Sequence, residues 1–135
     1  MKFYDRVTEL ARIHEFIQIV RNKGSRMLVI TGRRRIGKTR LALESVKEAD
    51  HLYLFTKKKR VPQLLDDWAD EVRAKYGNVF YGKFGKLEEF LKFLFEFSVD
   101  NPRVVIFDEV QNFLFTDPSA FGTFQKMFDL YKERS

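Results

Sequence analysis

Residues 31–40 read Thr-Gly-Arg-Arg-Arg-Ile-Gly-Lys-Thr-Arg (TGRRRIGKTR), and this stretch decides the fold that we expect for the whole chain. Gly32 and Gly37-Lys38-Thr39 match G-x-x-x-x-G-K-[ST], the Walker A or P-loop pattern. The glycines let the main chain approach a phosphate closely and take the dihedrals that the loop needs. The apolar run Met27–Ile30 precedes the loop, and a helical pattern over Thr39–Lys47 follows it. This strand–loop–helix context favours a phosphate-binding loop over a chance match.

The chemistry of such a loop predicts a role for its residues. Its backbone N–H groups would surround a phosphate chain, and the helix that begins near Lys38 would point its positive dipole end at that chain. We expect Lys38 to reach the β- and γ-phosphates and assist catalysis, and the Thr39 hydroxyl to ligate Mg²⁺. The expected nucleotide-binding residues of the loop are Gly32, Arg33, Arg34, Arg35, Ile36, Gly37, Lys38, Thr39 and Arg40.

A second motif supports the first. The apolar run Val104–Phe107 ends in Asp108 and Glu109, which is the Walker B arrangement of a buried strand followed by two carboxylates. We expect Asp108 to hold Mg²⁺, usually through water. Glu109 is expected to act as the general base that polarises the attacking water. Open α/β sheets bind ligands at the carboxyl ends of their strands, where both motifs fall.

The purine is predicted from motifs that the sequence lacks. Guanine-specific P-loop proteins carry N-K-x-D, whereas Asn22-Lys23 continues here as Gly24-Ser25. No D-x-x-G follows the second apolar strand, and no L-S-G-G-Q of transporter-type ATPases occurs. We therefore expect ATP as the nucleotide.

Apolar patterns along the chain alternate between helix and strand. The predicted helices cover 8–23, 39–47, 63–76, 87–97 and a segment from Asp117, and the predicted strands cover 27–30, 51–55 and 104–107. This alternation indicates an α/β fold with a parallel sheet. We expect one domain over residues 1–135, a P-loop NTPase with three α/β/α layers.

Charge and composition bound the remaining possibilities. Residues 1–60 carry 16 Lys/Arg against 6 Asp/Glu, and residues 61–135 carry 9 against 13. The basic first half suits an anionic partner, and the run Lys57–Arg60 raises nucleic acid as one, although such runs are more often solvated loops. No apolar run of about 18 residues and no signal core are present, so we expect a cytoplasmic chain without a membrane span. Absence of cysteine excludes disulfides and thiolate metal sites.

These motifs resemble the archaeal ATPase family, a branch of the AAA+ superfamily related to STAND-type signalling ATPases. Phe3–Leu10 (FYDRVTEL) is similar to the family's F-x-x-R-x-x-E-L opening. Residues 32–39 are similar to its G-R-R-R-[IV]-G-K-T loop, and Asp108-Glu109-Val110-Gln111 resembles its D-E-x-Q. The resemblance spans nearly the whole chain.

The resemblance implies further roles. It places Arg6 near the adenine or ribose, against the alternative of a surface arginine before a helix. Gln111 would read the γ-phosphate or the attacking water, or else cap the loop after the strand. Arg33–Arg35 would contact phosphate, a neighbouring subunit or the acidic half of this chain.

The resemblance also implies a partial domain, truncated before the family's sensor strand, which inserts between the Walker A and Walker B strands. We therefore expect the strands at 27–31 and 103–107 either to pair directly or to leave a gap. Unpaired strand edges, and apolar surface on the phenylalanine-rich helices at 87–97 and 120–133, would favour self-association.

Two classes of function stay open. One is a Mg²⁺-ATP-binding ATPase domain whose hydrolysis is slow or needs the missing C-terminal elements. The other is a non-hydrolysing nucleotide-binding or interaction module, with nucleic acid as one candidate partner. Intact Lys38, Thr39, Asp108 and Glu109 favour the first, and the short chain favours the second.

Overall fold

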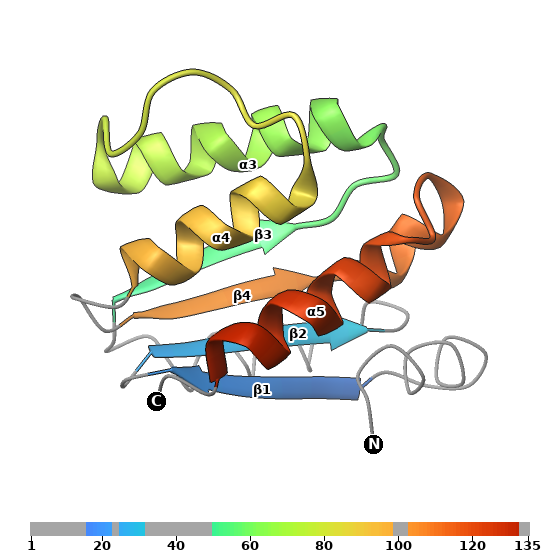
Figure 1. Cartoon of the computed structure of the whole chain (residues 1–135). Helices are drawn as coiled ribbons and strands as arrows, with labels where there is room; N and C mark the ends of the chain where they lie inside the picture. Colours follow the sequence, from blue (N-terminus) through green and yellow to red (C-terminus); the bar gives the residue numbers. More distant parts are fainter. Residues whose placement is uncertain (1–15, 23–24, 32–49, 99–102, 133–135) are drawn as a thin grey trace.

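The computed structural model describes residues 16–22, 25–31, 50–98 and 103–132 of the chain (Figure 1). The strands are β1 (Phe16–Asn22), β2 (Ser25–Thr31), β3 (His51–Phe55) and β4 (Val104–Asp108). The helices are α3 (Val61–Tyr76), α4 (Leu87–Phe97), the 3-10 helix η1 (Val110–Phe115) and α5 (Ala120–Lys132). The helix expected over 39–47 lies outside the described residues.

The strands form one sheet in the order β1-β2-β4-β3. On one side of β4, β2 runs parallel to it from Arg26 opposite Val104 to Val29 opposite Phe107. On the other side β3 is also parallel, and its last residue, Phe55, lies opposite Asp108. The expected α/β fold is therefore confirmed, and the sheet is parallel over β2, β4 and β3.

The direct pairing of β2 with β4 decides between the two arrangements expected for these strands. The ladder is continuous over the paired residues, so no gap separates the two strands. This ladder has none of the unpaired backbone groups that a gap would have exposed. The pairing of β2 with β4 therefore gives no reason to expect self-association.

The helix expected over Thr8–Lys23 is wrong for residues 16–22. These residues form β1, which runs antiparallel to β2 with Phe16 opposite Thr31 and Asn22 opposite Ser25. The stretch contains the β-branched residues Ile17, Ile19 and Val20, which favour a strand wherever a partner strand is available. Cross-strand pairing with β2 thus outweighs the helical spacing of the apolar residues.

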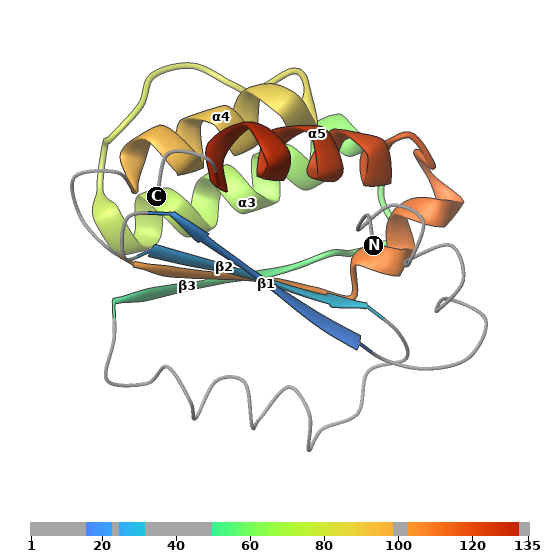
Figure 2. The same cartoon turned by 60° about the horizontal axis from the view of Figure 1, so that its bottom comes forward.

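The core lies between the sheet and a layer made of α3, α4 and α5, which cover the same face of the sheet (Figures 1 and 2). Alternate residues of the strands point into this layer, among them Leu54 and Phe107. Trp68 of α3 lies at its centre, with ring centroids 5.5 Å from Phe90, 5.6 Å from Phe107 and 6.0 Å from Phe113. The other face of β4 is buried too, because Val104 and Ile106 are at most 2% exposed.

The described phenylalanines of α4 and α5 are buried or half-buried, so the exposed apolar surface expected on the two helices is wrong. Five of them are at most 2% exposed: Phe90, Phe95, Phe121, Phe124 and Phe128. The two helices pack through these rings, and Phe95 stacks on Tyr131 with centroids 4.8 Å apart. Among the described large apolar side chains of these helices, Leu130 is the exposed one. Self-association stays a prediction without this support.

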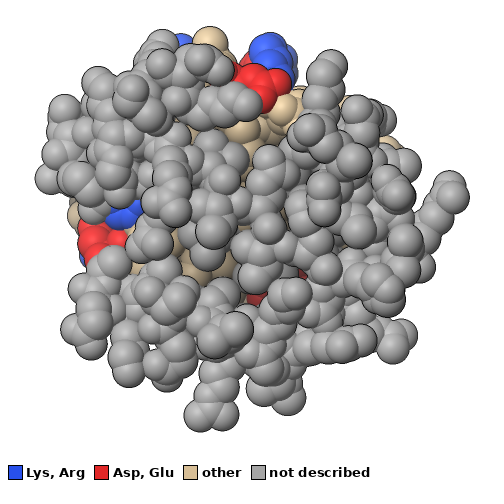
Figure 3. All heavy atoms as spheres, turned by 90° about the horizontal axis from the view of Figure 1, so that it is seen from below, with Lys and Arg blue, Asp and Glu red and all other residues tan. Residues whose placement is uncertain are grey.

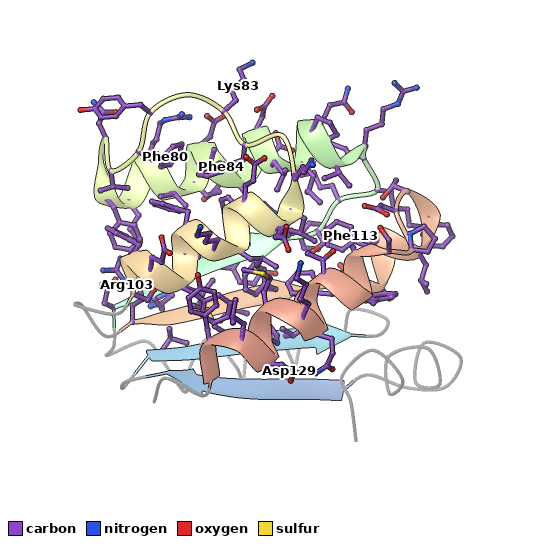
Figure 4. The ribbon with its side chains drawn as sticks, in the orientation of Figure 1. Phe80, Lys83, Phe84, Arg103, Phe113 and Asp129 are labelled. Atoms are coloured by element: carbon purple, nitrogen blue, oxygen red, sulfur yellow. The ribbon has the colours of Figure 1, made fainter. Side chains whose placement is uncertain are left out.

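A buried arginine lies at the amino end of β4 (Figure 4). The Arg103 side chain is 4% exposed, and its guanidinium carbon lies 3.9 Å from the Phe97 ring centroid and 4.5 Å from that of Tyr76. The Tyr76 hydroxyl donates a hydrogen bond to Asp50 Oδ1 at 2.8 Å. Burial, followed by this hydrogen bond, raises the pKa of Tyr76 from 10.0 to about 12.

This pKa predicts an alkaline loss of stability that Tyr76→Phe should lack. The folded chain holds the Tyr76 proton more tightly than the unfolded chain, so the stabilisation is complete below about pH 10 and is lost as the pH rises towards about 12. At neutral pH, Tyr76→Phe should unfold more easily by roughly 0.5–1.5 kcal/mol because a hydrogen bond is lost. Between about pH 10 and about pH 12 the stability difference between the two proteins should shrink.

Urea unfolding followed by the fluorescence of Trp68, the single tryptophan, measures this difference. Tyr81→Phe is the matched control, because Tyr81 is 95% exposed. A difference between the unmodified protein and Tyr76→Phe that stays constant across the alkaline range would contradict the prediction.

Candidate functional site

Asp108 lies at the carboxyl end of β4 and is fully buried. Both of its carboxylate oxygens accept hydrogen bonds. The Tyr53 hydroxyl of β3 donates to Oδ2, and the backbone N–H of Glu109 donates to Oδ1 at 2.9 Å. Because a buried charge is tolerated only when it is hydrogen-bonded, these donors both stabilise the carboxylate and fix its orientation.

Glu109 turns the chain at the end of β4. Its φ of 52° and ψ of 45° put it in the left-handed region, which non-glycine residues adopt at some cost. It is the residue before η1, and its carbonyl accepts a hydrogen bond from the Asn112 N–H at 3.0 Å. The Glu109 side chain is half-buried and lines a surface cleft, in contrast to the buried Asp108. Such unfavourable dihedrals persist where the surrounding structure enforces them and are frequent at functional sites.

Two hydrogen bonds join the turn after β4 to the loop after β3. The Thr56 N–H donates to the Asp108 carbonyl at 3.0 Å, and Asn112 Nδ2 donates to the Thr56 carbonyl at 2.7 Å. Asn112 is only 8% exposed, so the second bond is shielded from water. The ends of β3 and β4 therefore behave as one hydrogen-bonded unit around Asp108.

A cleft of about 610 Å³ opens beside this unit. It is lined by Phe55, Lys57, Lys58, Glu109, Gln111, Asn112 and Phe115. Gln111 is half-buried in this lining, where it shares the cleft with Glu109. The cleft brings together residues that follow two different strands, at the sheet edge where α/β proteins bind ligands.

The predicted site residues fall into two groups. Asp108 and Glu109 lie together with Gln111 at the carboxyl edge of the sheet. Arg6 and the predicted loop over Gly32–Arg40, including Lys38 and Thr39, lie outside the described residues. However, β2 is parallel to β4 with Val29 opposite Phe107, and it ends at Thr31. The loop thus follows in sequence a strand that ends at the same edge as Asp108.

Sequence reasoning missed three residues that hold the site together: Tyr53, Thr56 and Asn112. Alternation in the strand His51–Phe55 places Tyr53 on the face opposite Leu52 and Leu54. Only the register of β3 against β4 shows that this face also carries Asp108. Asn112 follows Gln111 in the sequence, and nothing in that local pattern distinguishes it as a buried polar contact.

Asp108 is the described residue that we expect to hold a metal ion. Within the described ranges, no three His, Asp or Glu side chains are grouped closely enough to hold a metal ion. A carboxylate such as Asp108 suits Mg²⁺, which keeps several waters and takes one or two protein carboxylates. Nor does any helix in the described part of the chain have the length and apolarity to cross a membrane.

Comparison with known proteins identifies the family. A family model described as an ATPase domain predominantly from Archaea matches residues 3–134. The uncharacterized protein MJECL04 of Methanocaldococcus jannaschii is 30% identical over 129 residues, which cover 96% of this chain and 26% of that protein. The chain thus spans about a quarter of that relative's length. No solved structure matches. Because the family match covers nearly the whole chain, this protein belongs to the family of ATPase domains found predominantly in Archaea.

Proposed function

We propose that this domain is a P-loop ATPase domain that binds Mg²⁺-ATP between the loop at Gly32–Arg40 and the carboxyl end of β4. The observation that carries the proposal is the parallel pairing of β2 with β4. It brings the strand before the G-x-x-x-x-G-K-T sequence beside the strand that ends in Asp108-Glu109. An α/β sheet offers a phosphate chain and its metal ion a common site where two such strands end. We propose ATP over GTP because the sequence lacks N-K-x-D.

We assign a role to each residue of the site from its surroundings and its place in the motifs. Asp108 would hold Mg²⁺ through water, and its orientation is set by Tyr53 and the Glu109 N–H. When bound, the ion would neutralise charge that develops on the phosphate oxygens. Lys38 would bind the β- and γ-phosphates, Thr39 would complete the metal site, and Arg6 would lie near the adenosine. Glu109, which lines the cleft, would accept a proton from the attacking water.

Hydrolysis by this domain is proposed to be slow. Since β2 and β4 pair directly, no strand between them supplies a polar side chain to the γ-phosphate. An arginine that stabilises the transition-state charge is worth about 10³–10⁵ in rate in other P-loop enzymes, and none is assigned here. The same pairing favours the second candidate function, a domain that binds nucleotide without turnover.

Lys38→Ala should weaken Mg²⁺-ATP binding. Lys38 is the cation that we assign to the β- and γ-phosphates, and loss of one charge-assisted contact costs roughly 1.5–3 kcal/mol, or about 10- to 150-fold in Kd. Isothermal titration measures the effect. Lys83→Ala is the control, since the Lys83 side chain is 83% exposed on the loop between α3 and α4 and points away from the body of the molecule (Figure 4). Equal affinity of Lys38→Ala and Lys83→Ala would refute the assignment.

Glu109→Gln should abolish hydrolysis and leave ATP binding intact. The amide keeps the size of the side chain and cannot accept the proton of the attacking water. Single-turnover phosphate release should show slow hydrolysis by the unmodified protein, below roughly 1 s⁻¹, and none by the variant. If the unmodified protein binds ATP and releases no phosphate, the domain is the non-hydrolysing module instead.

Tyr53→Phe should raise the Mg²⁺ concentration that half-saturates the site. The ring is kept, but Asp108 loses the hydroxyl that orients it, and loss of such a partner typically weakens metal binding about 10- to 100-fold. The measurement is a Mg²⁺ titration of ATP binding, with binding of metal-free ATP expected to change little.

Tyr76→Phe is the matched control for this titration. It also removes a tyrosine hydroxyl that donates to an aspartate, here Asp50, at the opposite end of the sheet. If both variants shift the titration equally, the effect is one of general stability and Tyr53 has no role in the metal site.

A further inference from the structure

Two segments that are far apart in the sequence form one exposed surface at the rim of the cleft. Lys57 and Lys58 follow β3 and are exposed. Phe115 ends η1 and is 69% exposed. The ammonium of Lys58 lies 4.5 Å from the centroid of the Phe115 ring. We refer to these three residues as the Lys57–Lys58–Phe115 surface.

The structure divides the run Lys57–Arg60, which sequence alone could treat as a solvated loop. Lys59 forms an ion pair with Asp67 of α3, with Nζ and Oδ2 2.8 Å apart. Lys58 instead contacts the Phe115 ring. Lys59 is therefore engaged by α3, whereas Lys57 and Lys58 can form a surface together with Phe115.

The backbone on both sides of this surface is well held. Thr56 is bonded to the Asp108 carbonyl and to Asn112, which fixes the chain immediately before Lys57. On the other side, the Phe113 carbonyl accepts hydrogen bonds from Thr116 N–H at 3.1 Å and Asp117 N–H at 2.7 Å. The aromatic ring and the lysines are thus presented from ordered turns. The Phe115 ring is therefore an exposed apolar contact surface next to a cationic side chain.

We propose that the Lys57–Lys58–Phe115 surface binds single-stranded nucleic acid. A base would stack on the exposed Phe115 ring, and the lysines would contact the neighbouring phosphates. Two lysines against one carboxylate, Glu109, leave the lining of the cleft with a positive balance. A duplex hides the faces of its bases, so the exposed ring specifies a single strand, whereas an acidic peptide would use the lysines alone.

Elsewhere on the described part of the surface, some basic side chains lie beside carboxylates. Figure 3 shows described basic side chains next to acidic ones at the margin of the face seen from below. Lys126 is likewise paired with Glu88 on the outer side of α4 and α5. The Lys57–Lys58–Phe115 surface combines lysines with an exposed ring, and the inference concerns binding only, so it stands independently of ATP hydrolysis.

The test is fluorescence anisotropy of a labelled oligothymidylate of about 15 nucleotides, within the site sizes of single-strand-binding folds. Phe115→Ala should weaken binding roughly 5- to 150-fold, as for loss of a stacked base, and Phe115→Tyr should retain it. Lys57→Gln/Lys58→Gln should lower the slope of log Kd against log salt by about 1.4, because each phosphate contact in a single strand contributes about 0.7.

Matched variants come from the loop between α3 and α4. Tyr81→Ala removes an aromatic ring that is 95% exposed, and Lys83→Gln/Lys86→Gln removes two exposed charges. Both should bind the oligonucleotide like the unmodified protein. Thermal unfolding checks that each variant is folded, as expected for exposed positions.

Three results would overturn the proposal. The first is unchanged binding by Phe115→Ala together with the lysine variant. The second is a matched duplex that binds as tightly as the single strand, which would indicate phosphate contacts without stacking. The third is an oligoglutamate peptide that displaces the oligonucleotide and binds Phe115→Ala equally well, which would indicate a surface for acidic peptides.

Discussion

The pairing of β4 with a parallel strand on each side is the constraint on which the rest of the structure depends. All five residues of β4 are buried, and both of its edges are occupied by β2 and β3. Its backbone groups are therefore paired within the sheet, and its side chains are held on both faces. As the last residue of the strand, Asp108 is held in place by the same pairing. Such a position suits the metal-binding role that we propose for Asp108, because little orientational freedom is left to lose on binding.

The sequence predicted the elements whose pattern is long or continuous. The helix expected at 87–97 is α4, the strand at 51–55 is β3, and α3 extends the expected 63–76 by two residues at its start. The failure at Phe16–Asn22 has a physical cause. Its apolar spacing fits a helix, but its β-branched residues fit a strand, and the available edge of β2 decides between them. Such a partner is not visible in a local pattern.

The sequence predicted the carboxylates of the candidate site but not the residues that hold them in place. Asp108 and Glu109 stand out because carboxylates follow an apolar run. Tyr53 is 55 residues away in sequence, and Asn112 is 56 residues from its acceptor, Thr56. These contacts depend on the register of β3 against β4, which a single sequence does not encode locally. The left-handed backbone of Glu109 was equally hidden, since glutamate has no special preference for that conformation.

The two ends of β4 show how the same problem, a buried charge, is solved in a structural and in a functional setting. At the amino end, the guanidinium of Arg103 lies against the rings of Phe97 and Tyr76, which are aromatic faces that stabilise a cation and enclose it. At the carboxyl end, Asp108 is held by directional donors, Tyr53 and the Glu109 N–H, beside an open cleft. Asp108 is as buried as Arg103, but the cleft beside it, lined by Glu109 and Gln111, gives a ligand room at this end of β4, where we propose that the chemistry of the domain takes place.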